Sequence, residues 1–461
     1  MDRVAHVGAG VSPAGAPGSS SHGLRRVAII GGGYAGMAAA VSLTERGIKV
    51  SVFESAKLLG GRARRIDYRG EVLDNGQHIL SGAYSELLRL MTLVGVGSNA
   101  TVRIPLTLNI PPQFSLRAPR WIAPLHLAWA LLSASGLSWP DRIAAIRFMR
   151  AMKSCNFQVD PAASVETLLT AHRQTANLIR FLWQPLTISA LNTPINIASA
   201  QVLASVLRDT LASRREASDL ILPQTDLSAL FPDAAAIWLA SRGSEIHLGR
   251  RVRSIAKSGE PDGAFEIATD TIHVSFDAVI LAIGPHQFDS ISLPPGSAPT
   301  APFAYEPIVT LYLKFDQRVR LPSPMLGQVN GLAQWFFDRR TLSSGGHDSQ
   351  LDDGLIAAVI SASGPHEELP QEQLAQRVLE ELARHTGPLP PLAWQKVVAE
   401  KFATFSCTMD VQERRPHTGT ATPGLFLAGD YTAGDYPATL EGAVRSGVAA
   451  AQQAASFLAR S

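Results

Sequence analysis

The stretch VAIIGGGYAG, residues 27–36, joins a short apolar run to a glycine-rich turn. Its first four residues are typical of a buried parallel strand, and the Ala- and Leu-rich residues up to Arg46 predict a helix. In such a strand-turn-helix unit Gly31 permits the tight turn, Gly33 lets a pyrophosphate approach the backbone, and Gly36 lets the helix pack on the strand. The stretch therefore predicts a Rossmann-type dinucleotide site.

A second strand and an acidic residue follow at the spacing that such a site needs. Lys49 to Glu54 predicts the strand, and the Glu54 carboxylate, about 20 residues beyond the glycines, can accept both ribose hydroxyls of an adenosine. The N–H groups of Tyr34 and Ala35, at the start of the helix, favour the negative charge of phosphates. A chance glycine turn with a solvated Glu54 is the alternative, and the complete order of the elements argues against it.

Composition excludes several classes of protein. The chain has 461 residues, of which 46% are hydrophobic and 17% charged, as expected of a folded chain with a large core. The net charge of +2 provides no strong basic field, so nucleic acid is not expected as a partner. Cys155 and Cys407 lie far apart and share no metal-ligand spacing, which predicts no disulfide framework, no metal site and a reducing, cytoplasmic location.

Two apolar stretches bear on membrane contact. Residues 181–207 carry no charge but contain polar side chains unsuited to hydrocarbon, which favours a buried core or a cavity lining. Residues 121–135 are apolar but short, which allows at most peripheral contact with the inner face of a membrane. Residues 1–24 predict a flexible tail. Arg25-Arg26 before an uncharged run suggests a twin-arginine export signal as an alternative, which the glycines of the turn disfavour.

The stretch LGGRA, residues 59–63, resembles the GGR signature of the flavin amine oxidase and phytoene desaturase superfamily. The resemblance implies an FAD cofactor, with Gly61 and Arg62 near its phosphates or flavin. Four further stretches follow in the superfamily's order. By this resemblance, residues 249–255 place Val252 near the adenine, and residues 278–285 contain Gly284 in the turn. Residues 424–430 end in Gly429 and Asp430 at the ribityl and pyrophosphate region, and residues 439–447, with Thr439 and Leu440, begin the last helix toward the flavin.

The spread of these motifs implies an α/β, flavin amine oxidase-like fold in which a Rossmann-type FAD-binding domain is built from discontinuous segments. We expect residues 25–102, 240–300 and 402–461 to form it. An α+β substrate domain would comprise 103–239, mostly helical, and 301–401, with strands near 307–315 and 354–361 and a helix near 371–385. The substrate pocket is expected at the junction of the two domains.

In the same superfamily the turn that corresponds to Asp74–Leu80 passes beside the flavin ring. Gly76 and Gln77 are therefore expected at the cofactor, and Gln77 and His78 are the candidate catalytic residues, with His78 a possible general acid. The alternative is that His78 only forms hydrogen bonds with flavin or backbone. Asp74 is expected to cap or brace the turn.

Amine oxidases of the superfamily place an aromatic residue where this chain has Thr439, which disfavours amine substrates. They also carry a lysine that reaches the flavin through water, in a strand that resembles residues 307–314. Lys314 is one position out of register with that lysine. We therefore expect Lys314 to lie at the surface.

A closer resemblance, to the hydroxysqualene dehydroxylases of bacterial hopanoid synthesis, covers nearly the whole chain. It rests on residues 74–80 DNGQHIL, 181–186 FLWQPL, 190–194 ALNTP, 198–202 ASAQV, 206–209 VLRD, 218–220 SDL, 226–232 DLSALFP and 334–339 QWFFDR. It implies a C30 isoprenoid alcohol as substrate, whose hydroxyl leaves as reduced flavin delivers a hydride, giving squalene. Aromatic faces stabilise cations, and Trp183, Trp335 and Tyr436 are candidates for that role.

Two alternatives remain open. A carotenoid or phytoene-type desaturase would move the hydride in the opposite direction, from substrate to oxidised flavin. An isoprenoid-binding carrier on the same fold, as in the Rab GDP-dissociation inhibitors, would have no need of an intact flavin site. The sequence does not indicate the electron donor.

Overall fold

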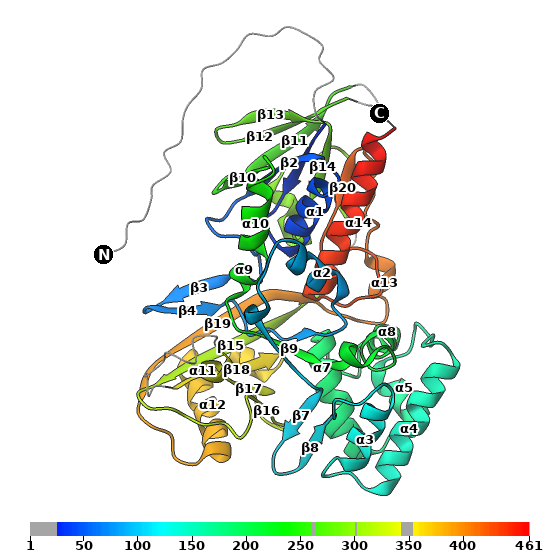
Figure 1. The fold of residues 1–461 in the computed structure, drawn as a ribbon, viewed down its shortest axis with the longest axis vertical. Helices are drawn as coiled ribbons and strands as arrows, with labels where there is room; N and C mark the ends of the chain where they lie inside the picture. Colours follow the sequence, from blue (N-terminus) through cyan, green and yellow to red (C-terminus); the bar gives the residue numbers. More distant parts are fainter. Residues whose placement is uncertain (1–24, 260–262, 300–301, 343–353, 461) are drawn as a thin grey trace.

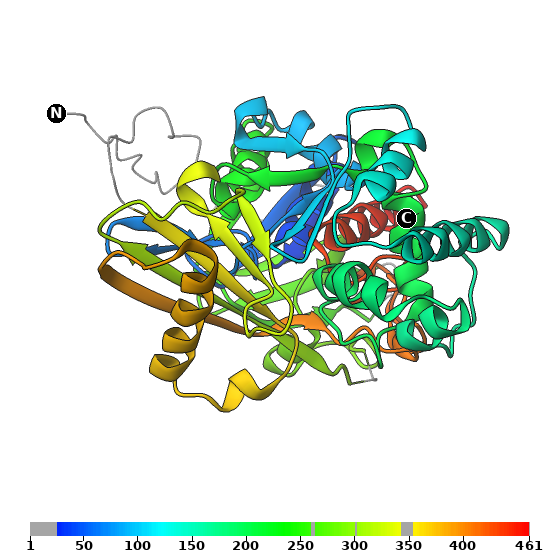
Figure 2. The same ribbon diagram turned by 90° about the horizontal axis from the view of Figure 1, so that it is seen from below.

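The computed structural model describes residues 25–259, 263–299, 302–342 and 354–460. The predicted tail, residues 1–24, lies outside the described residues. Figure 1 shows an upper lobe built around a parallel sheet and a broader lower lobe with an antiparallel sheet on one side and helices on the other. Figure 2, seen from below, separates the gold helix α12 from the teal helices α3–α5.

The parallel sheet has the strand order β10-β2-β1-β14-β20. Its strands are β10 (Glu245–Leu248), β2 (Lys49–Glu54), β1 (Arg26–Ile30), β14 (Ala278–Leu281) and β20 (Leu425–Leu427). Helices α1 (Tyr34–Thr44) and α14 (Leu440–Leu458) pack on the sheet and on each other. They approach so closely that a Cβ on Gly447 would lie 2.1 Å from the carbonyl oxygen of Ala35. The central position of β1 confirms the predicted Rossmann-type unit.

Smaller elements surround this sheet. An antiparallel sheet lies beside it, and α2 (Ser85–Leu93) packs on α14. The strands of that smaller sheet are β11 (Val252–Lys257), β12 (Phe265–Thr269) and β13 (His273–Phe276). Helix α10 (Pro232–Ala240) packs on α1 and β10, although our boundaries place it with the substrate domain. Those domain boundaries stay a prediction.

The antiparallel sheet of the lower lobe has the order β16-β17-β18-β15-β19. Its strands are β16 (Met325–Gly327), β17 (Trp335–Asp338), β18 (Gly354–Ser361), β15 (Tyr305–Phe315) and β19 (Leu392–Phe405). Helix α12 (Gln371–Thr386) shares a hydrophobic cluster with Leu311 and Leu313 of β15. Because side chains alternate along a strand, Thr310 and Tyr312 face the opposite side, toward the hairpin of β3 (Arg65–Tyr68) and β4 (Glu71–Asp74).

The other half of the lower lobe is mainly helical, as predicted. It contains α3 (Leu125–Ser133), α4 (Trp139–Ser154), α5 (Val165–Ala171), α6 (Ala176–Leu178), the π-helical turn η2 (Ile179–Trp183), α7 (Gln184–Leu191) and α8 (Ala200–Thr210). Two small sheets support the helices: β5 (Leu80–Ser81), β9 (Leu220–Pro223) and β6 (Thr101–Ile104) form one, and β7 (Thr107–Ile110) and β8 (Phe114–Arg117) the other. Within the described ranges, no helix is both long and apolar enough to cross a membrane.

Candidate active site

The three motif glycines of the β1–α1 turn have different surroundings. Gly31 adopts a φ of +112°, and a Cβ there would lie 2.5 Å from the carbonyl oxygen of Ala282. A Cβ on Gly36 would lie 1.9 Å from the carbonyl oxygen of Gly31. The Cβ of a residue at position 33 would meet no atom nearer than the Cα of Gly61 at 3.8 Å. The fold itself therefore demands Gly31 and Gly36, whereas a Cβ at position 33 would make only ordinary van der Waals contacts at the start of α1.

Glu54 ends β2 at the same edge of the sheet. Its carboxylate is buried and accepts hydrogen bonds from the N–H groups of Gly32 and Ala56, both at 2.7 Å. A carboxylate has about four acceptor positions, so two backbone donors orient it and leave capacity for further donors. The N–H of Arg250 donates to the Glu54 carbonyl, which brings the start of β11, and with it Val252, to this end of the sheet.

Arg62 and Asp430 meet across the chain. An Arg62 guanidinium nitrogen lies 2.6 Å from the Asp430 carboxylate, and another donates to the carbonyl of Ala403 at 2.8 Å. A small cavity beside this ion pair is lined by Arg62, Gly284, Pro285, His286, Tyr305, Phe405, Asp430 and Tyr431. The Tyr431 hydroxyl is buried, and among the described residues it has no hydrogen-bond partner. Burial raises the pKa of Tyr431, so this hydroxyl remains a proton donor in neutral solution.

Arg415 supports the loop that carries Asp430, and our motif analysis did not find it. Its buried guanidinium donates to four carbonyl oxygens of the segment after β20: those of Asp430, Thr432, Gly434 and Tyr436. Nothing in the local sequence signals this role, because the acceptors are all backbone atoms.

The N-terminus of α14 is shaped by two side chains. Thr439 caps the helix by accepting from the Gly442 N–H at 3.1 Å, and Leu440 is the first helical residue. Glu441 is fully buried and accepts from the N–H groups of Glu86 and Leu87, which ties α14 to the start of α2. Glu441 is thus a structural residue that sequence reasoning left without a role.

The predicted cofactor residues come together from distant segments. Gly61 has a φ of +61°, and its Cβ position lies 3.2 Å from the Cα of Gly33, so the GGR segment and the first glycine turn meet backbone to backbone. The Asn75 side chain donates to the Arg62 carbonyl at 3.0 Å, which places the 74–78 turn beside the same segment. Gly76, in this turn, adopts a φ of +115°.

The turn from Asp74 to His78 is braced by β15. The Tyr312 hydroxyl donates to the Asp74 carbonyl at 2.9 Å, and the Gln77 N–H donates to the Thr310 hydroxyl at 3.4 Å. The Asp74 side chain is buried and accepts from the Leu227 N–H at 2.8 Å. Asp74 therefore braces the turn, as predicted.

Arg339 connects Asp74 to Gln77. Its guanidinium lies 3.3 Å from the Asp74 carboxylate and donates to the Gln77 side-chain oxygen at 2.9 Å. Burial raises the pKa of Asp74 to about 6, and the charge of Arg339 opposes this rise. The resemblance included Arg339 but gave it no role, and its position follows from the pairing of β17 with β18.

His78 and Gln77 keep part of their hydrogen-bonding capacity free. Nδ1 of His78 lies 2.9 Å from the Gly76 carbonyl, which can only accept, so Nδ1 carries the proton in the neutral ring. Burial lowers the pKa of His78, and in the described part of the chain its Nε2 has no hydrogen-bond partner. Nε2 of Gln77 donates one N–H to the His78 carbonyl at 3.2 Å. These two side chains present an acceptor and a donor on the same turn.

The prediction that Lys314 lies at the surface is wrong. Lys314 is buried, and its Nζ lies 2.6 Å from a carboxylate oxygen of Glu71. It shares the face of β15 with Thr310 and Tyr312, and this face is covered by the β3–β4 hairpin. A carboxylate on that hairpin compensates the buried ammonium, a pairing between distant segments that local sequence cannot reveal.

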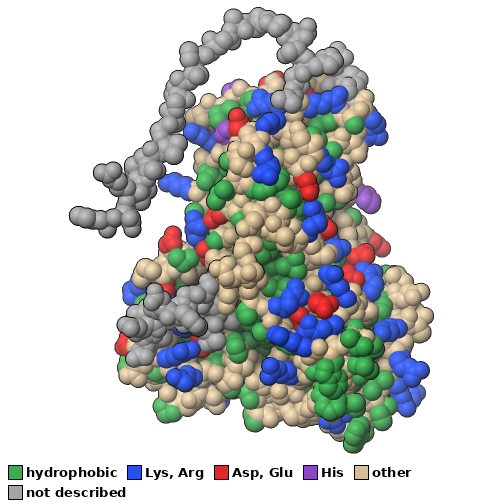
Figure 3. All heavy atoms as spheres, viewed as in Figure 1, with side chains coloured by type: hydrophobic (Ala, Val, Ile, Leu, Met, Phe, Trp, Pro, Cys, Tyr) green, Lys and Arg blue, Asp and Glu red, His purple; other side chains and the backbone are tan. Residues whose placement is uncertain are grey.

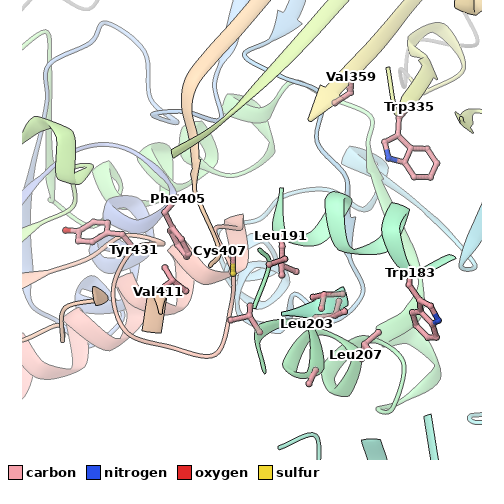
Figure 4. Close-up of a cluster of buried hydrophobic side chains, with 14 of the residues drawn as sticks. Trp183, Leu191, Leu203, Leu207, Trp335, Val359, Phe405, Cys407, Val411 and Tyr431 are labelled. Carbon is pink, nitrogen blue, oxygen red and sulfur yellow. The ribbon is translucent and has the colours of Figure 1, made fainter. Parts of the chain in front are cut away.

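The three aromatic candidates are engaged in packing. Trp183 donates its ring N–H to Gln174 at 2.8 Å, Trp335 donates to Ser189 at 3.0 Å, and the Arg445 guanidinium lies 4.4 Å from the ring centroid of Tyr436. Figure 4 places Tyr431 and Phe405 at one side of the buried hydrophobic cluster and Trp183 at the other, with Leu191 and Leu203 between them. Most of residues 181–207 belong to this cluster or pack against it.

These residues fit FAD. The side-chain-free backbone of Gly33 at the start of α1, the oriented Glu54 carboxylate and the unpartnered Tyr431 hydroxyl are features that a bound dinucleotide would use. No group of three or more metal-ligating side chains gathers within the described ranges.

The sequence model of the family of flavin-containing amine oxidoreductases matches residues 34–455 of this chain. The chain belongs to this family.

The hydroxysqualene dehydroxylase of Sinorhizobium fredii is 30% identical to this chain over 94% of it and 99% of the relative, and that of Zymomonas mobilis is 28% identical over 93% and 98%. The zeta-carotene desaturase of Zea mays is 24% identical over 92% of this chain and 82% of its own length. Cyclohexylamine oxidase from Brevibacterium oxydans shares the fold, with a TM-score of 0.66 and 18% identity over 95% of this chain and 100% of that structure.

Family membership confirms the predicted fold class, the FAD cofactor and an oxidoreductase activity. The resemblance to hydroxysqualene dehydroxylases is also confirmed.

Proposed function

We propose that this family member is an FAD-dependent hydroxysqualene dehydroxylase, which converts the C30 alcohol to squalene in hopanoid or other triterpenoid synthesis. The observation that carries the proposal is the near full-length identity of 28–30% to three hydroxysqualene dehydroxylases. The carotenoid desaturases match over a similar share of this chain at 24–25% identity, so a desaturase remains the second candidate.

The chain's own residues suit a long apolar substrate. A hydrophobic cluster extends through the helical half of the lower lobe and includes Phe405 and Tyr431, which line the cavity beside Arg62 and Asp430. A substrate that follows this cluster would bring an apolar chain to the edge of the flavin site. A C30 isoprenoid alcohol is an apolar chain of this kind with one polar hydroxyl.

The reaction consumes one hydride, which carries two electrons, and one proton, and it releases the hydroxyl as water. Reduced FAD supplies the hydride when bound. In our proposal Gln77 donates its remaining side-chain N–H to the departing oxygen, with its carbonyl oxygen held by Arg339. His78 supplies the proton after its Nε2 has been protonated, because Nδ1–H is already directed at the Gly76 carbonyl.

An anaerobic turnover experiment tests the direction of the reaction. The purified holoprotein is reduced, hydroxysqualene is added, and the oxidised-flavin absorbance is followed while the lipid is analysed. Reoxidation matched by an equal amount of squalene is expected. No reoxidation, together with bleaching of the oxidised enzyme by phytoene-like polyenes, would place the protein among the desaturases instead.

We further propose that the protein works in the cytoplasm, in peripheral contact with the inner face of the membrane, where a C30 isoprenoid resides. The absence of a membrane-crossing helix from the described ranges is consistent with such a location. The electron donor is expected to be a separate protein or a free reduced carrier.

A further inference from the structure

Large apolar side chains gather on the outside of helices α3 and α4. Figure 3 shows them as a green cluster at the lower right, over the place of these helices in Figure 1. They are Trp121, Ile122, Leu125, Trp129, Leu132, Trp139, Ile143 and Ile146, and we call them the apolar patch. Their exposed fractions range from 41% at Ile146 to 73% at Ile122. Contiguous exposure of this kind marks an interaction site.

The patch follows the helical repeat. Leu125, Trp129 and Leu132 share one face of α3, while His126 and Ala130 of the same helix are buried. On α4 the exposed face contains Trp139, Ile143 and Ile146, and the opposite face buries Ala145, Phe148 and Met152. Each helix is thus apolar on both its inner and its outer face, which core packing alone does not require.

The two helices are held as one unit. Arg142 of α4 donates to the carbonyls of Leu131 and Ala134 at the end of α3, at 3.2 Å and 2.8 Å. The rings of Trp121 and Trp129 lie 5.2 Å apart, which joins the residues before α3 to its exposed face. The apolar patch therefore has a defined shape in the isolated chain.

Exposed cations flank the patch along the same stretch of chain. Between residues 104 and 159 the chain has six cations and one acid, Asp141, which is buried at the start of α4. Five of the cations are exposed and have no ion-pair or hydrogen-bond partner among the described residues: Arg117, Arg120, Arg147, Arg150 and Lys153. Arg150 and Lys153 continue the outer face of α4 beyond Ile146.

We propose that the apolar patch and these five cations form a docking surface for an anionic phospholipid bilayer. Tryptophan favours the interface between headgroups and acyl chains, and unpaired Arg and Lys side chains favour lipid phosphates. The exposed cations beside the patch match a partner that carries negative charge. This surface would make the peripheral contact proposed above, whichever isoprenoid is the substrate.

The surface also lies close to the apolar interior. Phe148, on the inner face of α4, has its ring centroid 5.0 Å from that of Trp183, where the uncharged residues 181–207 begin. Phe181 stacks on Phe114 of β8 at 6.0 Å. Docking through α3 and α4 would thus set the hydrophobic cluster directly against the lipid.

Vesicle binding by the purified holoprotein tests the proposal. We expect sedimentation with vesicles of phosphatidylglycerol and phosphatidylcholine, and little with phosphatidylcholine alone. The variant R147Q/R150Q/K153Q should bind the anionic vesicles at least about tenfold more weakly, since each basic residue near an anionic surface contributes roughly a fivefold factor. A matched variant, R46Q/R377Q/R460Q, removes one exposed cation after the end of α1, one on α12 and one after the end of α14, and should bind as the wild type does.

A second variant separates insertion from electrostatic adsorption. W129S/I143S should show weaker quenching of tryptophan fluorescence by brominated lipid, because Trp121 and Trp139 remain, and should weaken binding, with the flavin content and the melting temperature unchanged. Equal binding to neutral and anionic vesicles, or equal loss in both triple variants, would overturn the proposal. Concentration-dependent dimerisation that W129S/I143S abolishes, without any vesicle binding, would assign the surface to a second copy of the chain. None of these readouts uses turnover, so they remain valid if hydroxysqualene is not the substrate.

Discussion

Gly33 and Gly36 lie in one turn, but neighbouring atoms constrain only Gly36 closely. We expect Gly33→Ala to fold normally and to bind FAD about tenfold or more weakly, because the added methyl group would fill the space at the start of α1 where a pyrophosphate approaches. The flavin-to-protein absorbance ratio and titration of the apoprotein measure this effect.

Gly36→Ala is the matched control for the fold. Its Cβ would lie 1.9 Å from the Gly31 carbonyl oxygen, so this variant should lose soluble yield and thermal stability. Wild-type FAD affinity in Gly33→Ala would show that the pyrophosphate does not pass position 33.

The protonation of His78 predicts the pH dependence of turnover. Burial lowers its pKa below the ordinary 6.5, so the ring is mostly neutral at pH 7. If His78 supplies the proton, the rate of anaerobic flavin reoxidation should rise as the pH falls toward this lowered pKa. The gain between pH 7.5 and pH 5.5 should be about tenfold or more, because the protonated fraction of a group whose pKa lies below 6.5 increases by at least that factor.

His78→Gln keeps a hydrogen-bond donor but cannot deliver a proton in this way. It should retain FAD, lose the acid limb of the profile and turn over on the order of 100-fold more slowly. A wild-type rate and profile in this variant would restrict His78 to its hydrogen bond with the Gly76 carbonyl.

At the scale of elements, Asp141 holds the start of α4. It forms a capping box with Ser138 and accepts from the side chains of Thr175 and Asn177 at 2.6 Å and 3.0 Å. Burial alone would raise the pKa of Asp141, but these hydrogen bonds lower it to about 2. Because this folded-state pKa is depressed, the stabilisation is present above the ordinary pKa of 3.8 and is lost as the pH falls toward 2.

Asp141→Ala should therefore lower the free energy of unfolding by about 2 kcal/mol at pH 7. Urea unfolding should show the difference from wild type narrowing between pH 5 and pH 3. Asp289→Ala, at an exposed carboxylate, serves as the control and should stay within about 0.5 kcal/mol of wild type. A constant difference at every pH would indicate lost packing instead of the charged hydrogen bonds.

At the scale of the whole molecule, Glu71 joins the hairpin β3–β4 to the lower lobe. It accepts from Lys314 of β15 and from Arg340, which follows β17, at 2.6 Å and 2.7 Å. Glu71→Gln reduces the compensation of a buried ammonium and should lower the free energy of unfolding by about 3 kcal/mol.

The double variant Glu71→Gln/Lys314→Met should recover part of this loss, since it removes the buried charge together with its partner. Urea unfolding of the wild type, the single variants and the double variant supplies the cycle. Additive losses would mean that the two side chains do not interact energetically.

The glycine turn, Glu54 and the first two strands were predictable because they form one continuous unit. In this unit the backbone conformation, the strand order and the steric need for glycine depend on residues within about 30 positions of one another. The predicted second strand coincides with β2, and Gly33, the glycine expected at the pyrophosphate, is the N-cap of α1.

The side chains that hold the site residues in place could not be predicted in this way. Arg339 reaches Asp74 and Gln77, Arg415 holds four backbone carbonyls, and Lys314 is buried against Glu71. Each of these contacts joins segments that the folding of two sheets brings together, and backbone acceptors leave no mark on the sequence. The sequence motifs were sufficient to predict the family, the cofactor and the positions of the motif residues. The hydrogen-bond partners and the burial of side chains depend instead on the packing of distant segments.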